Sequence, residues 1–223
     1  MAKLLPGTTC DSSRPRVLDL FCGAGGASSG YFRAGFNVVG VDIKPQPHYP
    51  FKFYQADAFD FVSWHGADFD VIHASPPCQF YCRIIREQYR NNHPDLISAV
   101  RDVLRATGKP FVIENVIEAR PLLHNPIMLC GSMFGLRVFR HRLFELSPER
   151  FILLPSCNHH FQPVLLTGSS LRYRRLFGRG EALAADKRAA CGIDWMTVSE
   201  LDSSIPPAYT AFLGSVLLSF LTK

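Results

Sequence analysis

Short apolar runs alternate with helix-compatible stretches along the first half of the chain. Residues 17–21 indicate a buried strand, a glycine-rich turn follows it, and a helix-compatible stretch then runs to Ala34 and ends at Gly35. Residues 37–43 indicate a second apolar strand, which the following prolines end. The order predicted for this part is strand, glycine turn, helix, strand.

The same alternation continues further along. Residues 69–74 indicate a buried strand, helical spacing predicts a helix over residues 94–107, and residues 111–115 indicate another strand. Strands that alternate with helices predict βαβ units and an α/β fold with a mainly parallel sheet, whose ligands bind beyond the carboxyl ends of the strands. Cys78 and Glu114 both fall at such ends.

The alternation weakens after residue 146, and periodicity assigns no structure to the irregular stretch that follows. An apolar helix is predicted over residues 210–221, after two prolines. The predicted organisation is a loose lead-in (1–15), a main domain (16–146), a short basic segment (147–185) and a part that returns to the main domain (186–223).

The composition is that of a globular intracellular protein. The 223 residues are 47% apolar and 19% charged, which allows one sizeable core and argues against wholesale disorder. The longest apolar stretch, residues 211–221, is too short to span about 30 Å of hydrocarbon. Seven cysteines, an odd number without regular spacing, indicate a reducing compartment rather than a disulfide framework.

The net charge of +5 is concentrated in one segment. Between Arg137 and Arg188 there are ten Lys and Arg residues against four Asp and Glu, so this segment carries more than the whole excess. Concentrated positive charge favours contact with a polyanion, because phosphate attraction needs cations that lie close together. The alternative is a solvated basic loop.

The glycine turn and two aspartates indicate a nucleotide-like ligand. A glycine turn between a strand and a helix lets backbone amides approach a ligand. Asp42 ends the next strand and Asp57 follows the short apolar run 51–54, so these carboxylates suit a ribose and an adenine amino group. The alternative is that each aspartate only caps a helix or a turn.

Cys78 follows two prolines that stiffen the backbone and aim its thiol. Covalent catalysis needs such an aimed thiol, whereas an isolated cysteine is more often a buried structural residue. The position of Cys78 at a strand end, with Glu114 at the end of a later strand, favours the catalytic interpretation.

Several motifs, in this order and spacing, resemble those of the cytosine-5 DNA methyltransferase family over residues 16–146 and 186–221. They are residues 19–26 (DLFCGAGG), 76–79 (PPCQ), 114–116 (ENV), 140–144 (RHRLF, like the family's Arg-x-Arg motif) and 205–207 (IPP) with Ala211. The resemblance implies a Rossmann-like class I methyltransferase fold with helices on both faces of the sheet. It also implies a DNA (cytosine-5)-methyltransferase of the cytoplasm, in a bacterial or phage-infected cell.

The implied mechanism assigns four catalytic residues. Cys78 attacks C6 of cytosine, which makes C5 a nucleophile toward the methyl group of S-adenosylmethionine. Glu114 binds the N3 edge and the 4-amino group, Arg142 holds O2, and Arg140 shapes the site. The implied cofactor-binding residues are Phe21, Gly23, Gly25, Asp42, Ile43, Asp57, Ala58, Pro76 and Ser204.

The resemblance implies a DNA substrate whose target cytosine is flipped out of the duplex, and we expect a monomer. Family members carry a substantial recognition region after the Arg-x-Arg motif, whereas residues 147–185 provide only thirty-nine residues. We therefore expect short or relaxed sequence specificity that depends on phosphate contacts. The candidates for these contacts are Arg172, Arg174, Arg175 and Arg179.

Some positions depart from the family pattern. Val138 replaces the usual Gln, Asp42 replaces the more common Glu, and Ser203 and Ser204 with Ile205 replace the usual Gly-Asn-Val. The serines are expected near the methyl donor, so a modified sulfonium donor, such as a carboxylated one, is an alternative.

A possible metal site stays incomplete in the sequence. Cys157, His159 and His160 lie close together in the sequence, but no fourth ligand follows at a spacing typical of zinc sites, although Cys130 or Cys191 could supply one in space. We therefore assign no metal ligands from the sequence.

Three other functions remain open at this stage. RNA is one alternative substrate, because a related branch of the family methylates tRNA. A non-catalytic binding module and a small-molecule methyltransferase are alternatives from other classes, against which Cys78, Glu114 and Arg142 together argue. Roles as a restriction companion, in phage self-protection and in regulation are not distinguished.

Overall fold

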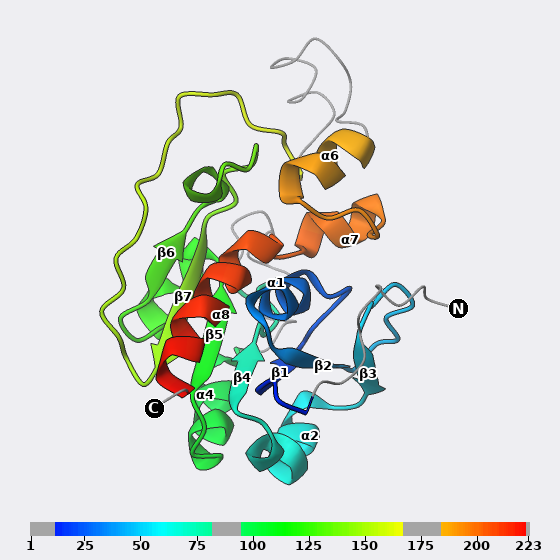
Figure 1. Cartoon of the computed structure of the whole chain (residues 1–223), viewed down its shortest axis with the longest axis vertical. Coiled ribbons are helices and arrows are strands. Elements are labelled where there is room, and N and C mark those ends of the chain that lie inside the picture. The colour runs from blue at the N-terminus through cyan, green and yellow to red at the C-terminus, as the bar shows by residue number, and fades with distance from the viewer. Residues whose placement is uncertain (1–11, 82–94, 167–183, 222–223) are drawn as a thin grey trace.

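A seven-stranded sheet forms the centre of the computed structural model, which describes residues 12–81, 95–166 and 184–221 (Figure 1). The strand order is β3-β2-β1-β4-β5-β7-β6. Five strands run parallel: β1 (Arg16–Leu20), β2 (Asn37–Asp42), β3 (Lys52–Gln55), β4 (Val71–Ala74) and β5 (Phe111–Asn115). β7 (Arg142–Ser147) pairs antiparallel with β5, and β6 (Ile127–Leu129) pairs antiparallel with β7.

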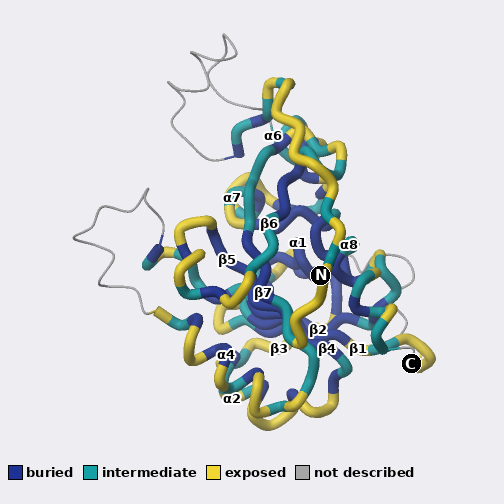
Figure 2. Tube along the Cα trace, turned by 90° about the vertical axis from the view of Figure 1, so that its left-hand side faces the viewer, coloured by how far each residue is buried: buried dark blue, intermediate teal, exposed yellow. Residues whose placement is uncertain are grey.

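Helices cover both faces of this sheet, as the class I methyltransferase fold requires. The central strands are buried on both faces, which is why they appear in the sequence as continuous apolar runs. Consecutive residues of a strand pack on opposite faces of the sheet. Leu18 packs in the cluster with α2 (Ala58–His65) and α4 (Ile97–Ala106). Val17 packs in the cluster with α1 (Gly26–Ala34) and α8 (Pro207–Leu221). Figure 2 shows the buried strands at the centre of the molecule.

α1 and α8 lie in unusually close contact. A Cβ atom on Gly30 would be 2.0 Å from Thr210 Oγ1 and 2.1 Å from the Pro207 carbonyl oxygen. The Thr210 hydroxyl also donates a 2.7 Å hydrogen bond to the Ala27 carbonyl. The glycines after β1 therefore permit helix packing as well as ligand approach, and they join the C-terminal helix to the first βα unit.

A smaller unit of two helices adjoins the sheet. α6 (Ala184–Cys191) and α7 (Val198–Ser203) pack around a separate apolar cluster that includes Ala24, Val138 and Leu166. The Trp195 indole donates a 2.9 Å hydrogen bond to the Ala24 carbonyl, which fixes this unit against the glycine turn. The expected boundary at residue 185 falls inside α6.

The predicted strands and helices of the first half are confirmed, with ends shifted by up to three residues. α8 begins at Pro207, because proline is compatible with the first position of a helix. The sequence analysis did not predict α2, α6, α7, β3, β6, β7 or the short 3₁₀ helices η1 (Gly66–Asp68), η2 (Ile117–Leu122) and η3 (Gly131–Phe134). Among the described helices, none has the length and apolar character needed to cross a membrane.

Gly30→Ala should destabilise the protein by about 3 kcal/mol, because the new methyl group meets backbone atoms that cannot move independently. Alanine's higher helix propensity offsets only about 1 kcal/mol of this packing cost. Urea unfolding followed by circular dichroism measures the difference. Ser215→Ala on the exposed side of α8 is the control and should stay within about 0.5 kcal/mol of the wild type. An equally small effect of Gly30→Ala would contradict the close packing.

Candidate active site

A cavity of about 370 Å³ lies beyond the carboxyl ends of the parallel strands. Segments that follow β1, β2, β4 and β5 line it, together with the start of β7 and the end of α7. The sequence-predicted residues that the cavity brings together are Phe21, Gly23, Asp42, Ile43, Pro76, Cys78, Glu114, Arg142 and Ser204.

The turn after β1 is fixed by hydrogen bonds to β2. The Gly23 amide donates to Asp42 Oδ2 at 3.0 Å, and the Lys44 amide donates to Asp42 Oδ1 at 2.9 Å. Phe21 has a φ of 58°, a left-handed conformation that is costly for a bulky residue. Such strain at a cavity wall indicates a side chain held in place for a ligand.

Asp19 is a cavity-lining residue that the sequence analysis missed. Its side chain is fully buried and hydrogen-bonds Ser28 on α1, whose hydroxyl also lies 2.7 Å from that of Tyr49. Burial raises the pKa of Asp19 to about 7. Its Oδ1 has no hydrogen-bond partner among the described residues. A buried acceptor at a cavity suits a cationic group of a ligand.

The segment that carries Cys78 is held by β5. The Asn115 side chain donates a 3.0 Å hydrogen bond to the Pro76 carbonyl, and the Ser75 amide donates to the Leu20 carbonyl at 3.2 Å. Two prolines and these two bonds fix the path of the backbone up to the thiol. The Asn of the 114–116 motif therefore positions Cys78, a role that only the structure reveals.

Glu114 and Arg142 form an ion pair in the cavity wall, with Arg142 Nε 3.1 Å from Glu114 Oε1. Burial raises the pKa of Glu114, while the Arg142 charge and a hydrogen bond from Ser75 act in the opposite direction. The result is a buried carboxyl that can share a proton with a bound base.

Behind Glu114 lies a chain of buried polar side chains. The Tyr31 hydroxyl is 3.0 Å from His73 Nδ1, and His73 Nε2 is 2.9 Å from the Ser75 hydroxyl. Burial lowers the pKa of His73 to about 3, so its ring is neutral. If Ser75 donates to Glu114, His73 Nε2 must carry the proton and Tyr31 must donate to Nδ1. Through Ser75, these groups help to orient Glu114 in addition to its ion pair with Arg142.

A second cavity, of about 490 Å³, adjoins the first. The two cavities share four wall residues: Cys78, Val116, Arg142 and Ser203. Arg140 lines only the second cavity. Its Nη2 donates to the Asp202 carbonyl at 2.9 Å, and its buried Nε has no partner within the described parts of the chain. Burial, with the nearby Arg142 charge, lowers the pKa of Arg140 to about 10.

Three predicted cofactor residues do not line the cavity: Gly25, Asp57 and Ala58. Asp57 caps α2, because its Oδ1 accepts hydrogen bonds from the amides of Phe59 and Asp60 at 2.8 and 3.1 Å. A contact between Asp57 and adenine stays a prediction.

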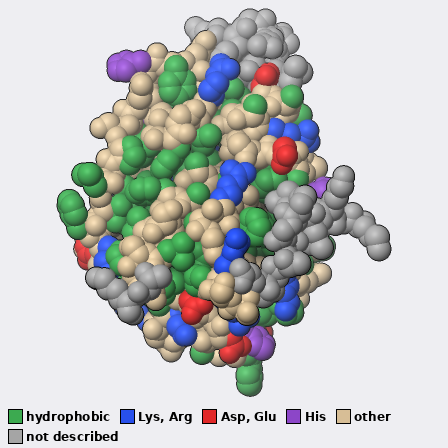
Figure 3. Space-filling model, viewed as in Figure 1, with side chains coloured by type: hydrophobic (Ala, Val, Ile, Leu, Met, Phe, Trp, Pro, Cys, Tyr) green, Lys and Arg blue, Asp and Glu red, His purple; other side chains and the backbone are tan. Residues whose placement is uncertain are grey.

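The predicted phosphate-binding arginines, Arg172, Arg174, Arg175 and Arg179, lie outside the described residues. Some of the basic residues that are described have internal partners: besides Arg140 and Arg142, Lys187 pairs with Asp202 at 3.2 Å. On the face drawn in Figure 3, Lys and Arg side chains form separate spots rather than one patch. The described part of the basic segment therefore carries less free charge than its composition indicates.

The fold and the cavity define a class I methyltransferase, and comparison with known proteins gives the family. Residues 15–125 match the model of the C-5 cytosine-specific DNA methylase family. The type II methyltransferase M.XorII of Xanthomonas oryzae pv. oryzae is 32% identical over 121 residues, which are 47% of this chain. The chain belongs to the cytosine-5 DNA methyltransferase family. The matched region is 28% of the length of M.XorII.

Solved structures share the fold at low sequence identity. The S. pombe Dnmt2 methyltransferase superposes with a TM-score of 0.61 at 17% identity, over 95% of this chain and all of that one. The Entamoeba histolytica methyltransferase EhMeth gives 0.60 at 14% identity, with the same coverage.

Asp19→Asn should change how stability depends on pH. The folded pKa of Asp19, about 7, exceeds its ordinary value of 3.8, so the folded protein holds this proton more tightly than the unfolded chain. The contribution of the protonated Asp19 carboxyl to the free energy of unfolding is greatest below about pH 4 and is lost as pH rises toward 7. Between pH 4.5 and 8, the free energy of unfolding of Asp19→Asn should therefore rise by on the order of 3 kcal/mol relative to that of the wild type.

Urea unfolding at both pH values measures this gain. The exposed Asp194→Asn is the control and should show the same difference from the wild type at both. Parallel pH profiles for Asp19→Asn and the wild type would contradict a protonated buried Asp19.

Proposed function

We propose that the chain is a DNA (cytosine-5)-methyltransferase that transfers a methyl group from S-adenosylmethionine to cytosine through a covalent bond between Cys78 and C6. The observation that carries this proposal is that Cys78, Glu114 and Arg142 line the same cavity as Phe21 and Asp42. A thiol, a carboxyl and a guanidinium for the base thus adjoin an aromatic ring and a carboxylate for the methyl donor.

The residues on the base side account for the chemistry. Cys78, as thiolate, bonds to C6, while Glu114 contacts N3 and the 4-amino group and stabilises the charge that develops there. Arg142 holds the base at O2 and keeps Glu114 oriented through their ion pair. C5 then attacks the methyl group, and its bond to the sulfonium sulfur breaks, which leaves S-adenosylhomocysteine. A base removes the C5 proton, and cleavage of the C6–S bond releases 5-methylcytosine and restores the Cys78 thiolate.

The methyl-donor side fits S-adenosylmethionine. When bound, this cofactor supplies an electrophilic methyl group on a sulfonium. The unpartnered Oδ1 of Asp19 is an acceptor for its ammonium group, Asp42 is one for ribose hydroxyls, and Phe21 is a surface for adenine. Ser204 lines the same cavity, but its hydroxyl donates to the Leu201 carbonyl at 3.0 Å.

The second cavity provides the approach for nucleic acid. The second cavity shares Cys78 and Arg142 with the first, so a base that enters through it lies beside the thiol. A base inside a duplex cannot present C6 to a thiol, so the target must be unpaired or flipped out.

The free thiols of the described cysteines also favour a reducing compartment, and we place the activity in the cytoplasm.

Cys78→Ser should lower methyl transfer at least about 10³-fold, because the hydroxyl is a far weaker nucleophile toward C6. Glu114→Gln should lower it about 10²-fold while the protein stays folded. Transfer of tritiated methyl groups to DNA and to tRNA, tested in parallel, measures both the rate and the substrate. Full activity of Cys78→Ser would exclude the covalent mechanism, and labelling of tRNA alone would replace DNA with RNA as the substrate.

Methylation should occur at a short or relaxed DNA site, because only the short stretch between β7 and α6, residues 148–183, takes the place of a recognition region that contacts base edges. Bisulfite sequencing of DNA from cells that express the chain maps the modified cytosines, and mass spectrometry of the base identifies the transferred group. A strict site of five or more base pairs would contradict this expectation, and a carboxymethyl group would contradict unmodified S-adenosylmethionine as donor.

A further inference from the structure

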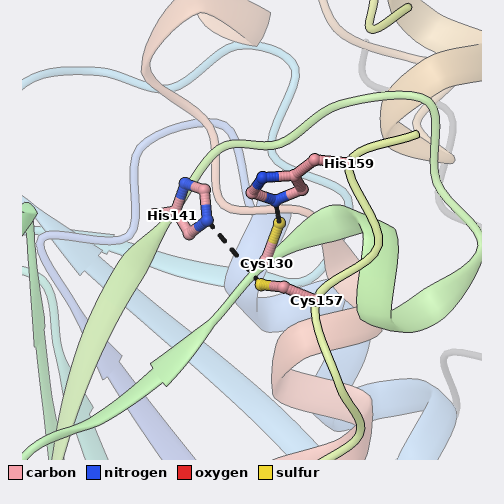
Figure 4. Close-up of side chains that lie close together, drawn as sticks. All are labelled: Cys130, His141, Cys157 and His159. Atoms are coloured by element: carbon pink, nitrogen blue, oxygen red, sulfur yellow. Dashed lines mark hydrogen bonds between the residues drawn. The ribbon is translucent and has the colours of Figure 1, made fainter. Parts of the chain in front are cut away.

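Four side chains with metal-binding atoms converge beside the start of β7 (Figure 4). Cys130 follows β6, His141 immediately precedes β7, and Cys157 and His159 come from the irregular segment after β7. One ligand atom from each residue lies within 4.8 Å of all the others. Cys130 is buried and Cys157 is exposed, so the group spans from the protein interior to the surface.

The distances between these atoms suit a small tetrahedral ion. Cys130 Sγ is 3.3 Å from His159 Nε2, and Cys157 Sγ is 3.8 Å from His141 Nε2. Zinc bonds to nitrogen and sulfur are about 2.0–2.3 Å long, so the ligands of tetrahedral zinc lie about 3.3–3.8 Å from one another. The four atoms therefore need only small shifts to surround zinc.

We propose that Cys130, His141, Cys157 and His159 bind one structural zinc ion. Two thiolates and two imidazoles form a common zinc ligand set, and four protein ligands leave no open position for a substrate. Of the residues noted in the sequence, Cys157 and His159 belong to this group, and Cys130 rather than Cys191 joins them. His141, which the sequence analysis did not note as a ligand, completes the group.

The surroundings of the four ligands hold them in place. The ring of Phe139 stacks on His159 at a centroid distance of 4.1 Å, which fixes the imidazole plane. The Ser132 hydroxyl is 3.2 Å from Cys130 Sγ and accepts a 3.1 Å hydrogen bond from the Asn158 amide. Ser132 therefore joins the two segments that carry the cysteines, as a supporting residue of a metal site does.

The ion would fasten the middle of an irregular segment. Residues 148–166 form no helix or strand and run along the outside of the molecule, from the end of β7 toward α6 (Figure 1). Val164 and Leu166 are buried at the end near α6, whereas Phe151 and Leu153, on the other side of Cys157, are 96% and 84% exposed. Zinc would supply the missing constraint and would join the segment to the strand that carries Arg142.

The test is the zinc content of the full chain, purified without a histidine tag, stripped with a chelator under reducing conditions and reloaded with zinc. Mass spectrometry of the metal should give about one zinc per chain. Cys157→Ser and His159→Ala should each bind zinc at least about 100-fold more weakly in competition with a chelating dye. His160→Ala is the matched control, because this exposed neighbour lies outside the cluster, and it should bind zinc like the wild type.

Cobalt provides a second measurement that does not depend on methyl transfer. Loaded with cobalt, the wild type and His160→Ala should show the visible absorption of a tetrahedral site with thiolate ligands, and Cys157→Ser should lose it. Three results would overturn the proposal: no zinc in the reloaded wild type, equal binding by His159→Ala and His160→Ala, or a Cys130–Cys157 disulfide whose reduced form binds no zinc. Because these readouts are independent of activity, they remain decisive even if the proposed methyltransferase function fails.

Discussion

The antiparallel pairing of β7 with β5 determines which side chains meet in the candidate active site. In a parallel sheet, a strand that follows β5 would deliver its first residue to the opposite edge. Because β7 runs antiparallel, Asn115 pairs with Leu143 and Glu114 pairs with Phe144, so the start of β7 lies at the carboxyl end of β5. This register places Arg142 beside Glu114 and brings both to the end of β4, where Cys78 follows.

Buried polar groups around the site support or form part of the cavity wall. The neutral His73 ring links Tyr31 to Ser75 and supports Glu114 without adding charge. Asp19 lies under the glycine turn with one oxygen bonded to Ser28 and the other unpartnered in the described structure. Isolated buried charges are costly, so burial raises the pKa of Asp19. A cationic ligand beside it would lower this pKa again.

The sequence predicts the parts of the fold that have a regular pattern. β1, β4 and β5 are continuous apolar runs, and the motifs at their ends identify Cys78, Glu114 and the glycine turn. β7 lacks such a run, because Glu145 interrupts it; this buried carboxylate pairs with Arg101, 2.7 Å away and distant in sequence, and accepts a hydrogen bond from the His124 amide. No periodicity reveals that pairing. The same holds for Asp19, which the sequence places in an apolar strand and only the structure places at the cavity.

Three consecutive residues that lead into β7 contact three different neighbours. Arg140 donates a hydrogen bond to the carbonyl of Asp202 at the end of α7. His141 contacts Cys157 of the irregular segment 148–166, and Arg142 pairs with Glu114. The Tyr209 hydroxyl on α8 also donates to the Arg140 carbonyl at 2.7 Å. The wall between the two cavities is thus attached to α7, to residues 148–166 and to the sheet. A shift in any of these would move Arg142 relative to Cys78, so the geometry that the proposed catalysis needs depends on attachments well outside the cavity.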